Sequence, residues 1–166
     1  KSISTTVKKL RNYRFRNNIT VIYSKSNGGA GEARNIGIGH ASGDWVIFAD
    51  SDDYFSDNAF ELTQQFLANK EDVIYFGVNS ITELGNQSYR HLRYMKLVED
   101  YLSDRKFENE LKFHFLSPWG KMIRRELLEK YNIRFEETIA GNDNLFSLKV
   151  AHNTRRLTAT YNVLYI

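Results

Sequence analysis

The chain has 166 residues, of which 42% are hydrophobic and 26% are charged, and this suits one domain with a single buried core. The formal net charge of +3 is small and the basic residues are scattered, so the composition does not predict a nucleic-acid-binding face. The lack of cysteine excludes disulfide bonds and thiolate metal sites, and it fits a cytoplasmic location.

No stretch of the sequence approaches the roughly 18 apolar residues needed to cross a bilayer, and no signal peptide opens the chain. We therefore expect a cytoplasmic protein whose membrane association, if any, is peripheral and at the inner face of the cell membrane. The chain starts at Lys1 without an initiator methionine and ends on an apolar stretch, so we interpret it as a fragment.

The first part of the chain alternates apolar runs with segments of helical periodicity. The β-branched run at residues 19–23 predicts a strand. A glycine-containing turn then leads into a helix at 30–41, where small and apolar residues recur at steps of three and four. The continuous apolar run at 45–49 predicts a strand that is covered on both faces.

A second helix is predicted at residues 58–67, where Asn58 and Glu61 are spaced like a capping box. A further strand follows at 73–78. The residues expected on the inner side of this helix are Ala59, Phe60, Thr63, Phe66 and Leu67. The alternation of strands and helices predicts an α/β sheet with right-handed crossovers, in which ligands bind at the carboxyl ends of strands.

The rest of the chain is less regular, but it offers several further elements. In chain order these are a hairpin around Gly85 and Asn86, a helix at 104–115, a strand at 120–123, a helix at 125–131, a helix from Asn142 with Leu145, Leu148 and Ala151 inward, and a pair of strands from Leu157.

Asp50, Asp52 and Asp53 follow directly after the predicted strand at 45–49. Three carboxylates so close together repel one another unless a positive charge lies between them. Mg²⁺ and Mn²⁺ prefer carboxylate and phosphate oxygens, so one or two of these aspartates and a diphosphate would complete a metal site. The alternative is a solvated acidic turn before the next helix.

Gly28, Gly29 and Gly31 lie just before and within the start of the predicted helix at 30–41. Glycines allow close backbone approach, and the helix start offers N–H groups to a phosphate or a sugar hydroxyl. Simple turn chemistry is the alternative. Arg34 lies one turn further on, where its side chain can reach back to the same sheet edge, or can form a surface ion pair instead.

Two blocks carry a resemblance to a known family: SNGGAGEARNIG at residues 26–37 and ASGDWVIFADSDD at 41–53. Together they resemble the centre of family 2 glycosyltransferases with the GT-A fold, a mixed, Rossmann-like α/β sheet flanked by helices. The stretches at 119–135 and 141–144 resemble the acceptor part of the same family. The resemblance divides a single partial domain, 1–166, into a nucleotide-sugar half at about 1–78 and an acceptor half at about 79–166.

The resemblance implies roles for particular residues. Asp50 and Asp52 match the family's Asp-x-Asp motif, which contacts the nucleotide-sugar and the metal-bound diphosphate, with Asp53 adjacent. Arg34 is implied near the donor. Asp143 matches the acidic position that serves inverting members as general base, although Asn142 stands where a Glu usually precedes it.

The implied reaction moves a sugar from a UDP-sugar onto a saccharide or lipid-linked saccharide acceptor, with Mn²⁺ or Mg²⁺, in cell-surface polysaccharide synthesis. Gly28 and Gly29 would join the donor site. Trp119 is a candidate platform for an acceptor sugar, and a core tryptophan is nearly as good an interpretation. For Asp143 the alternative to a general base is a helix N-cap.

The front of the chain departs from the family. Its members open with two strands whose ends hold the nucleobase, and neither strand is present, so residues 1–17 are interpreted as the helix that follows them. We therefore expect a sheet that lacks the first strands and a chain that binds nucleotide sugars poorly by itself.

Two other functions remain open at this point. One is a nucleotidyltransferase, which has a related sheet and also uses aspartates with a metal. The other is a sugar-binding module of the same fold that has lost turnover.

Overall fold

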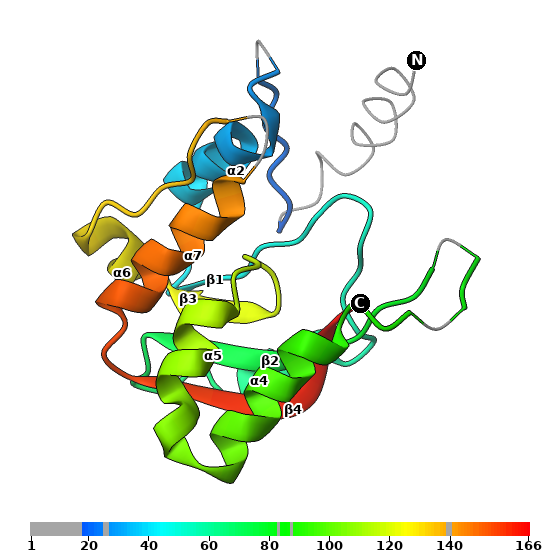
Figure 1. The fold of residues 1–166 in the computed structure, drawn as a ribbon. Helices are drawn as coiled ribbons and strands as arrows, with labels where there is room; N and C mark the ends of the chain where they lie inside the picture. Colours follow the sequence, from blue (N-terminus) through cyan, green and yellow to red (C-terminus); the bar gives the residue numbers. More distant parts are fainter. Residues whose placement is uncertain (1–17, 25–26, 83, 87, 139–140) are drawn as a thin grey trace.

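The computed structural model describes residues 18–24, 27–82, 84–86, 88–138 and 141–166 (Figure 1). The helix expected at residues 1–17 lies outside these ranges. The described part contains a four-stranded mixed sheet with helices on both faces, which confirms the predicted α/β class. Within the described residues, no helix is long and apolar enough to cross a membrane.

The sheet has the order β1-β3-β2-β4. β3 is antiparallel to both of its neighbours, whereas β2 and β4 are parallel. β1 and β2 therefore run in the same direction, with β3 between them. The strands are β1 (Trp45–Val46), β2 (Val73–Val78), β3 (Lys121–Arg124) and β4 (Leu157–Tyr165).

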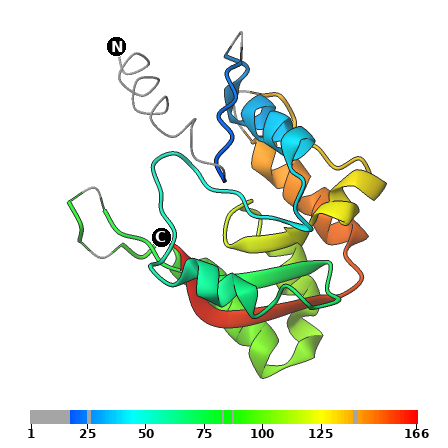
Figure 2. The ribbon, with the colours of Figure 1, turned by 180° about the vertical axis from the view of Figure 1, so that it is seen from behind.

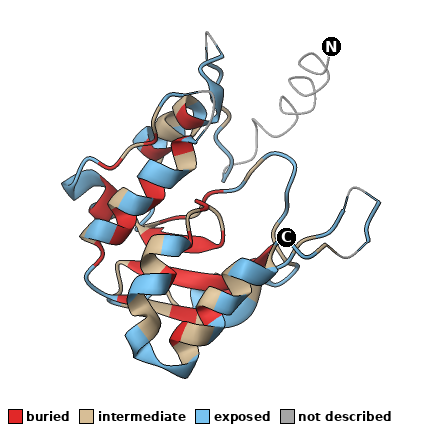
Figure 3. Cartoon of the chain, viewed as in Figure 1, coloured by how far each residue is buried: buried red, intermediate tan, exposed pale blue. Residues whose placement is uncertain are grey.

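β2 is buried at all six positions because helices cover both faces of the sheet. Val73 and Tyr75 join the larger core cluster, whereas Ile74 and Phe76 join a smaller one with Leu62. α3 (Ala59–Gln64) covers the smaller cluster from the face opposite α4 and α5 (Figure 2). Buried residues concentrate on the strands and on the inward sides of the helices (Figure 3).

The face of the sheet that carries the larger core cluster is covered by the remaining helices. These are α2 (Gly29–His40), α4 (Leu92–Ser103), a 3₁₀ turn at Arg105–Phe107, α5 (Glu108–His114), α6 (Arg125–Lys130) and α7 (Asn142–Asn153). The predicted helices at 30–41 and 125–131 and the strands at 73–78 and 120–123 are confirmed to within one residue. The hairpin is also confirmed, because the Thr82 N–H donates to the Asn86 carbonyl at 2.8 Å.

Two strand predictions need correction. Residues 19–23 form no strand and join none of the four strands, and Ile19, Ile22 and Tyr23 are exposed. β-branched residues favour a strand only where a neighbour pairs with it. The run at 45–49 is a strand only at Trp45–Val46, which pair with Arg124 and Ile123 of β3.

Two helix predictions are wrong in detail. Asn58 makes no side-chain capping bond, and Phe60 and Leu67 are exposed, because α3 ends at Gln64 and turns Ala59 and Leu62 toward the sheet. In the stretch before residue 115, the sequence predicted one helix at 104–115, and α4 was missed.

The face of α7 and the strands after it also differ from expectation. Ala151 is buried as expected, but Leu145 and Leu148 are exposed, and Phe146 and Val150 are buried in their place. The expected pair of strands from Leu157 is the single strand β4, with irregular register against β2 between Phe76 and Val78.

α2 lies unusually close to the backbone that precedes α7. A Cβ added to Gly31 would lie 2.3 Å from the Glu136 carbonyl oxygen, so only glycine fits there. A Cβ added to Gly37, on the same helix, would meet nothing within 4 Å.

We predict that Gly31→Ala lowers the free energy of unfolding by about 1–3 kcal/mol, because the methyl group forces α2 away from residue 136. Gly37→Ala is the matched control, and it should raise stability by about 0.5–1 kcal/mol because it only removes glycine's backbone freedom. Denaturant titration of both variants measures the difference. Equal effects of the two substitutions would contradict the close approach.

Candidate functional site

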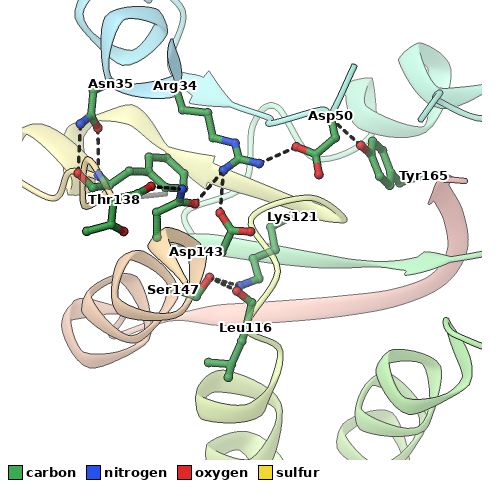
Figure 4. A network of polar contacts seen from close by, with 11 residues as sticks. Arg34, Asn35, Asp50, Leu116, Lys121, Thr138, Asp143, Ser147 and Tyr165 are labelled. Atoms are coloured by element: carbon green, nitrogen blue, oxygen red, sulfur yellow. Dashed lines mark hydrogen bonds and ion pairs between the residues drawn. The ribbon is translucent and has the colours of Figure 1, made fainter. Parts of the chain in front are cut away.

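Arg34 on α2 joins two acidic residues that are far apart in the sequence (Figure 4). Its Nη2 donates to Asp50 Oδ1 at 2.5 Å, and its Nη1 donates to Asp143 Oδ1 at 2.6 Å. Nη1 also lies 3.2 Å from the Asn142 amide oxygen. The guanidinium packs over the Phe135 ring at 5.1 Å, and only 12% of the side chain is exposed. The alternative of a surface ion pair therefore does not describe Arg34, which is largely buried and binds two acids.

Asp50 lies four residues beyond the end of β1, on the side of the sheet that Arg34 reaches. Its backbone N–H donates to the Tyr165 hydroxyl at 2.6 Å, which ties the acidic turn to the end of β4. Burial raises the pKa of that hydroxyl, and the nearby Asp53 carboxylate raises it further, so Tyr165 stays neutral. Asp52 and Asp53 are exposed. Of the acidic run, Asp50 alone makes an ion pair with Arg34 in the described structure.

Asp143 lies in the first turn of α7 but does not cap the helix. The N-cap is Gly141, whose φ of 77° suits glycine, and among the described residues no side-chain hydrogen bond caps the helix. Burial raises the pKa of the Asp143 carboxyl, the Asp50 carboxylate adds to the rise, and Arg34 and Lys121 oppose it. The capping interpretation is therefore wrong, and Asp143 is a carboxylate whose proton affinity is increased.

Gly28 and Gly29 lie at the start of α2, and their N–H groups are already bound. The Gly28 N–H donates to the Glu32 carboxylate at 2.8 Å, and the Gly29 N–H donates to the Asn27 side chain at 3.1 Å. A phosphate at this helix start would have to replace these side chains. The proposed donor role of the two glycines thus stays a prediction.

Asn35 is a positioning residue that sequence reasoning missed. Its amide donates to the Phe135 carbonyl at 3.0 Å and accepts from the Phe135 N–H at 2.8 Å, as a neighbouring strand would. It holds the segment before α7 against α2, next to Arg34. Only its place after Arg34 in the helix could have drawn attention to it, because its partner lies 100 residues away.

Trp119 lies in a row of aromatic rings beside the acidic turn. It stacks on Tyr165 with centroids 5.4 Å apart, and its edge meets Tyr94 at 5.0 Å. The indole is partly buried and packs against the main core. Its position near Asp50 suits an acceptor platform, and its packing equally suits a structural role.

A groove of about 370 Å³ lies between α2 and the β1 segment, and Arg34 is among the residues that line it. Gly37 and Ile38 line it from the helix, and Trp45 and Phe48 from the strand side. The groove is largely apolar, so it adds no ligand for a metal.

Lys121, on β3, is another residue that the sequence did not single out. Its side chain is only 1% exposed, and burial lowers the pKa of its ammonium group to about 7, although the Asp143 carboxylate opposes the shift. The aromatic rings of Tyr75 and Phe115 lie 5.4 and 5.2 Å from Nζ.

The sequence model described as "Glycosyl transferase family 2" matches residues 2–132. The chain belongs to this family. The matched region includes the Arg34 helix and the acidic turn, and Asp143 lies beyond it. The family match thus confirms the predicted resemblance.

Curated relatives in the same family are longer than this chain. Glycosyltransferase GlyA of Streptococcus pneumoniae is 32% identical over 76% of the chain, which spans 19% of GlyA. The uncharacterized glycosyltransferase EpsJ of Bacillus subtilis is 31% identical over 89% of the chain, which spans 44% of EpsJ. The chain therefore spans less than half the length of these relatives.

A solved structure of TarS from Staphylococcus aureus, residues 1–349 with UDP-GlcNAc, has the same fold. It superposes with a TM-score of 0.76 at 25% identity, and the match covers 97% of this family 2 chain and 45% of the TarS chain. TarS is named as a poly(ribitol-phosphate) β-N-acetylglucosaminyltransferase. The likeness confirms the GT-A class of the sheet described above.

We predict that the buried Lys121 makes stability depend on pH. Its pKa is about 7 in the folded state, against the ordinary lysine value of 10.5 in the unfolded chain, so between these two pH values the unfolded chain binds more protons. Stability should therefore rise from pH 7 to 9.5, by at most about 1.4 kcal/mol per pH unit, and Lys121→Met should remove this rise. Urea titration across that range measures it. If the free energy of unfolding depends on pH in the same way in both proteins, the lowered pKa of Lys121 is contradicted.

Proposed function

We propose that this chain transfers a sugar from a UDP-sugar to a saccharide acceptor, in an inverting and metal-dependent reaction. One observation carries the proposal: a single guanidinium holds Asp50, after β1, and Asp143, at the start of α7. The donor-side acidic turn and the candidate base thereby lie on two sides of one site.

The donor is inferred from the family and from TarS, which was solved with UDP-GlcNAc and with UDP. UDP-GlcNAc is therefore the first donor to test. Membership of a sugar-transferring family favours this reaction over nucleotidyl transfer.

The acidic turn fits a divalent cation only with help from the donor. No group of three metal-binding side chains exists among the described residues, and Arg34 already engages Asp50. Asp52 is exposed next to it. Mg²⁺ commonly binds one or two carboxylates together with substrate phosphates, and such a set suits Asp50 and Asp52. A bound cation would neutralise charge on the departing diphosphate.

Asp143 is the proposed base. Its raised pKa brings the carboxylate closer to the value at which a general base works well near neutral pH. It takes the proton from the acceptor hydroxyl while the hydroxyl oxygen forms a bond to the anomeric carbon. The bond from that carbon to the UDP oxygen breaks in the same step, which inverts the configuration and releases UDP.

The acceptor is proposed to be a saccharide, free or lipid-linked, in cell-surface polysaccharide synthesis at the inner face of the membrane. Relatives named for poly(ribitol-phosphate) glycosylation and for succinoglycan biosynthesis support this setting. Trp119 would contact the acceptor, because its ring adjoins the acidic turn through Tyr165.

We predict that Asp143→Asn in the full-length protein lowers the rate of UDP release from UDP-GlcNAc by about 10²- to 10⁴-fold, because the amide cannot accept a proton. The amide oxygen can still accept a hydrogen bond from Arg34, so the fold and donor affinity should persist. In the wild-type protein the acidic limb of the pH–rate profile should lie above the ordinary aspartate value of about 4.

Glu136→Gln and Glu137→Gln are matched controls, because both acids lie in the segment before α7. They should retain activity within a few-fold. If either removes turnover while Asp143→Asn does not, the base is misassigned. If the wild-type protein releases no UDP from any UDP-sugar tried, the noncatalytic alternative gains support.

A further prediction concerns the cation. Removal of divalent ions with EDTA should abolish UDP release, and Mn²⁺ or Mg²⁺ should restore it. Asp52→Asn should raise the Mn²⁺ concentration needed for half-maximal activity, whereas Asp57→Asn, an exposed acid outside the run, should not. Activity unchanged by EDTA would overturn metal dependence and leave the role of Asp143 intact.

A further inference from the structure

Lys121 is held by polar contacts that the proposed reaction does not use. It is a lysine on a central strand with a fully covered side chain. Its ammonium donates to the Phe115 carbonyl and, at 3.4 Å, to the Ser147 hydroxyl. An unpaired buried charge is costly, so a lysine at this place has to be fixed by its partners.

These partners belong to two segments of the chain that flank the site, the loop at 115–120 and α7. Phe115 begins the loop at 115–120, which carries Trp119. Ser147 lies on α7 one turn beyond Asp143, so both face the same side of the helix. The Ser147 hydroxyl in turn donates to the Leu116 carbonyl at 2.6 Å. Figure 4 shows Lys121 and Ser147 below the Asp143 carboxylate, next to Leu116.

The loop itself has little freedom to adjust. Gly120 has a φ of 68°, and a Cβ there would lie 2.6 Å from Val78 Cγ1. The loop thus meets β3 in one geometry, and Lys121 follows directly after it. The contacts of Lys121 and Ser147 transmit that geometry to α7.

We propose that Lys121 is a positioning residue that, with Ser147, fixes the first turns of α7 against the 115–120 loop and so sets the place of Asp143 relative to Trp119. This inference rests on the proposed role of Asp143. Lys121 does not touch the reacting groups. Loss of Lys121 should therefore lower kcat and leave the donor KM unchanged, because the donor is proposed to bind on the Asp50 side of Arg34.

Lys121→Met tests the proposal in the full-length protein, because methionine keeps the unbranched shape and removes the donors and the charge. We expect kcat for UDP release from UDP-GlcNAc to fall by about ten-fold or more, since small displacements of a catalytic group cost up to about 10² in rate. The KM for UDP-GlcNAc should stay within about two-fold, as uniform donor binding is untouched.

Lys112→Met is the matched control. Lys112 donates to the Thr154 carbonyl at 3.1 Å, just beyond the last turn of α7 and far along the helix from Asp143. It should leave kcat unchanged. An equal loss in both variants, or an unchanged kcat in a folded Lys121→Met protein, overturns the proposal.

A second variant and a second measurement keep the test decisive. If Lys121→Met does not fold, Ser147→Ala takes its place, and it should lower kcat without changing the donor KM; an unchanged kcat there overturns the proposal.

Hydrogen–deuterium exchange is the second measurement, and it needs no substrate. The first turns of α7 should exchange faster in Lys121→Met than in Lys112→Met, and equal exchange overturns the proposal. Absence of UDP release by the wild-type protein would count against the proposed function, and exchange alone would then decide this inference.

Discussion

The double ion pair of Arg34 is the contact on which the arrangement of the site depends. Without a cation between them, the Asp50 and Asp143 carboxylates would face each other across a partly buried space and repel. The guanidinium offers donors on both nitrogens in a fixed plane, so it can hold both acids at once. A lysine, which has one charged nitrogen, could not span the same two partners with the same geometry.

The residues around Arg34 leave its side chain few alternative positions. Phe135 lies under the guanidinium, and Asn35 binds the backbone of that same residue. Gly31, one turn earlier on α2, allows the helix to approach the carbonyl of Glu136. The helix, the segment before α7 and the acidic turn are thereby fixed together, so a donor would meet a site that is already organised.

The sequence predicted those features that local patterns determine. α2, β2 and α6 were found at their expected bounds because helical periodicity or an unbroken apolar run identifies them without knowledge of any partner. The inward faces of α3 and α7 were predicted only in part, at Ala59 and Ala151, since a face is chosen by what packs against it. The strand at 19–23 failed for the same reason: its residues suit a strand, but no ladder forms there.

The site shows the same division. Asp50, Asp143 and Arg34 were identified by motif, but their direct contact was not, because it joins residues 16 and 109 positions apart. Asn35 and Lys121 lie within the stretches at 26–37 and 119–135 that carry the resemblance, but their side-chain roles were missed because asparagine and lysine are normally solvated. The alternative of Asp143 as a helix cap was reasonable from spacing, and it was excluded only by the position of Gly141 at the cap.

The order of the sheet has a consequence for how the chain reaches this state. β1 and β2 come from the first half of the sequence, but β3, from the second half, lies between them, and β4 completes the sheet last. During synthesis, the pairing of β1 and β2 with β3 has to wait until residue 124 has left the ribosome. The four described strands therefore pair across both halves of the sequence, and these long-range pairings should make that step slow.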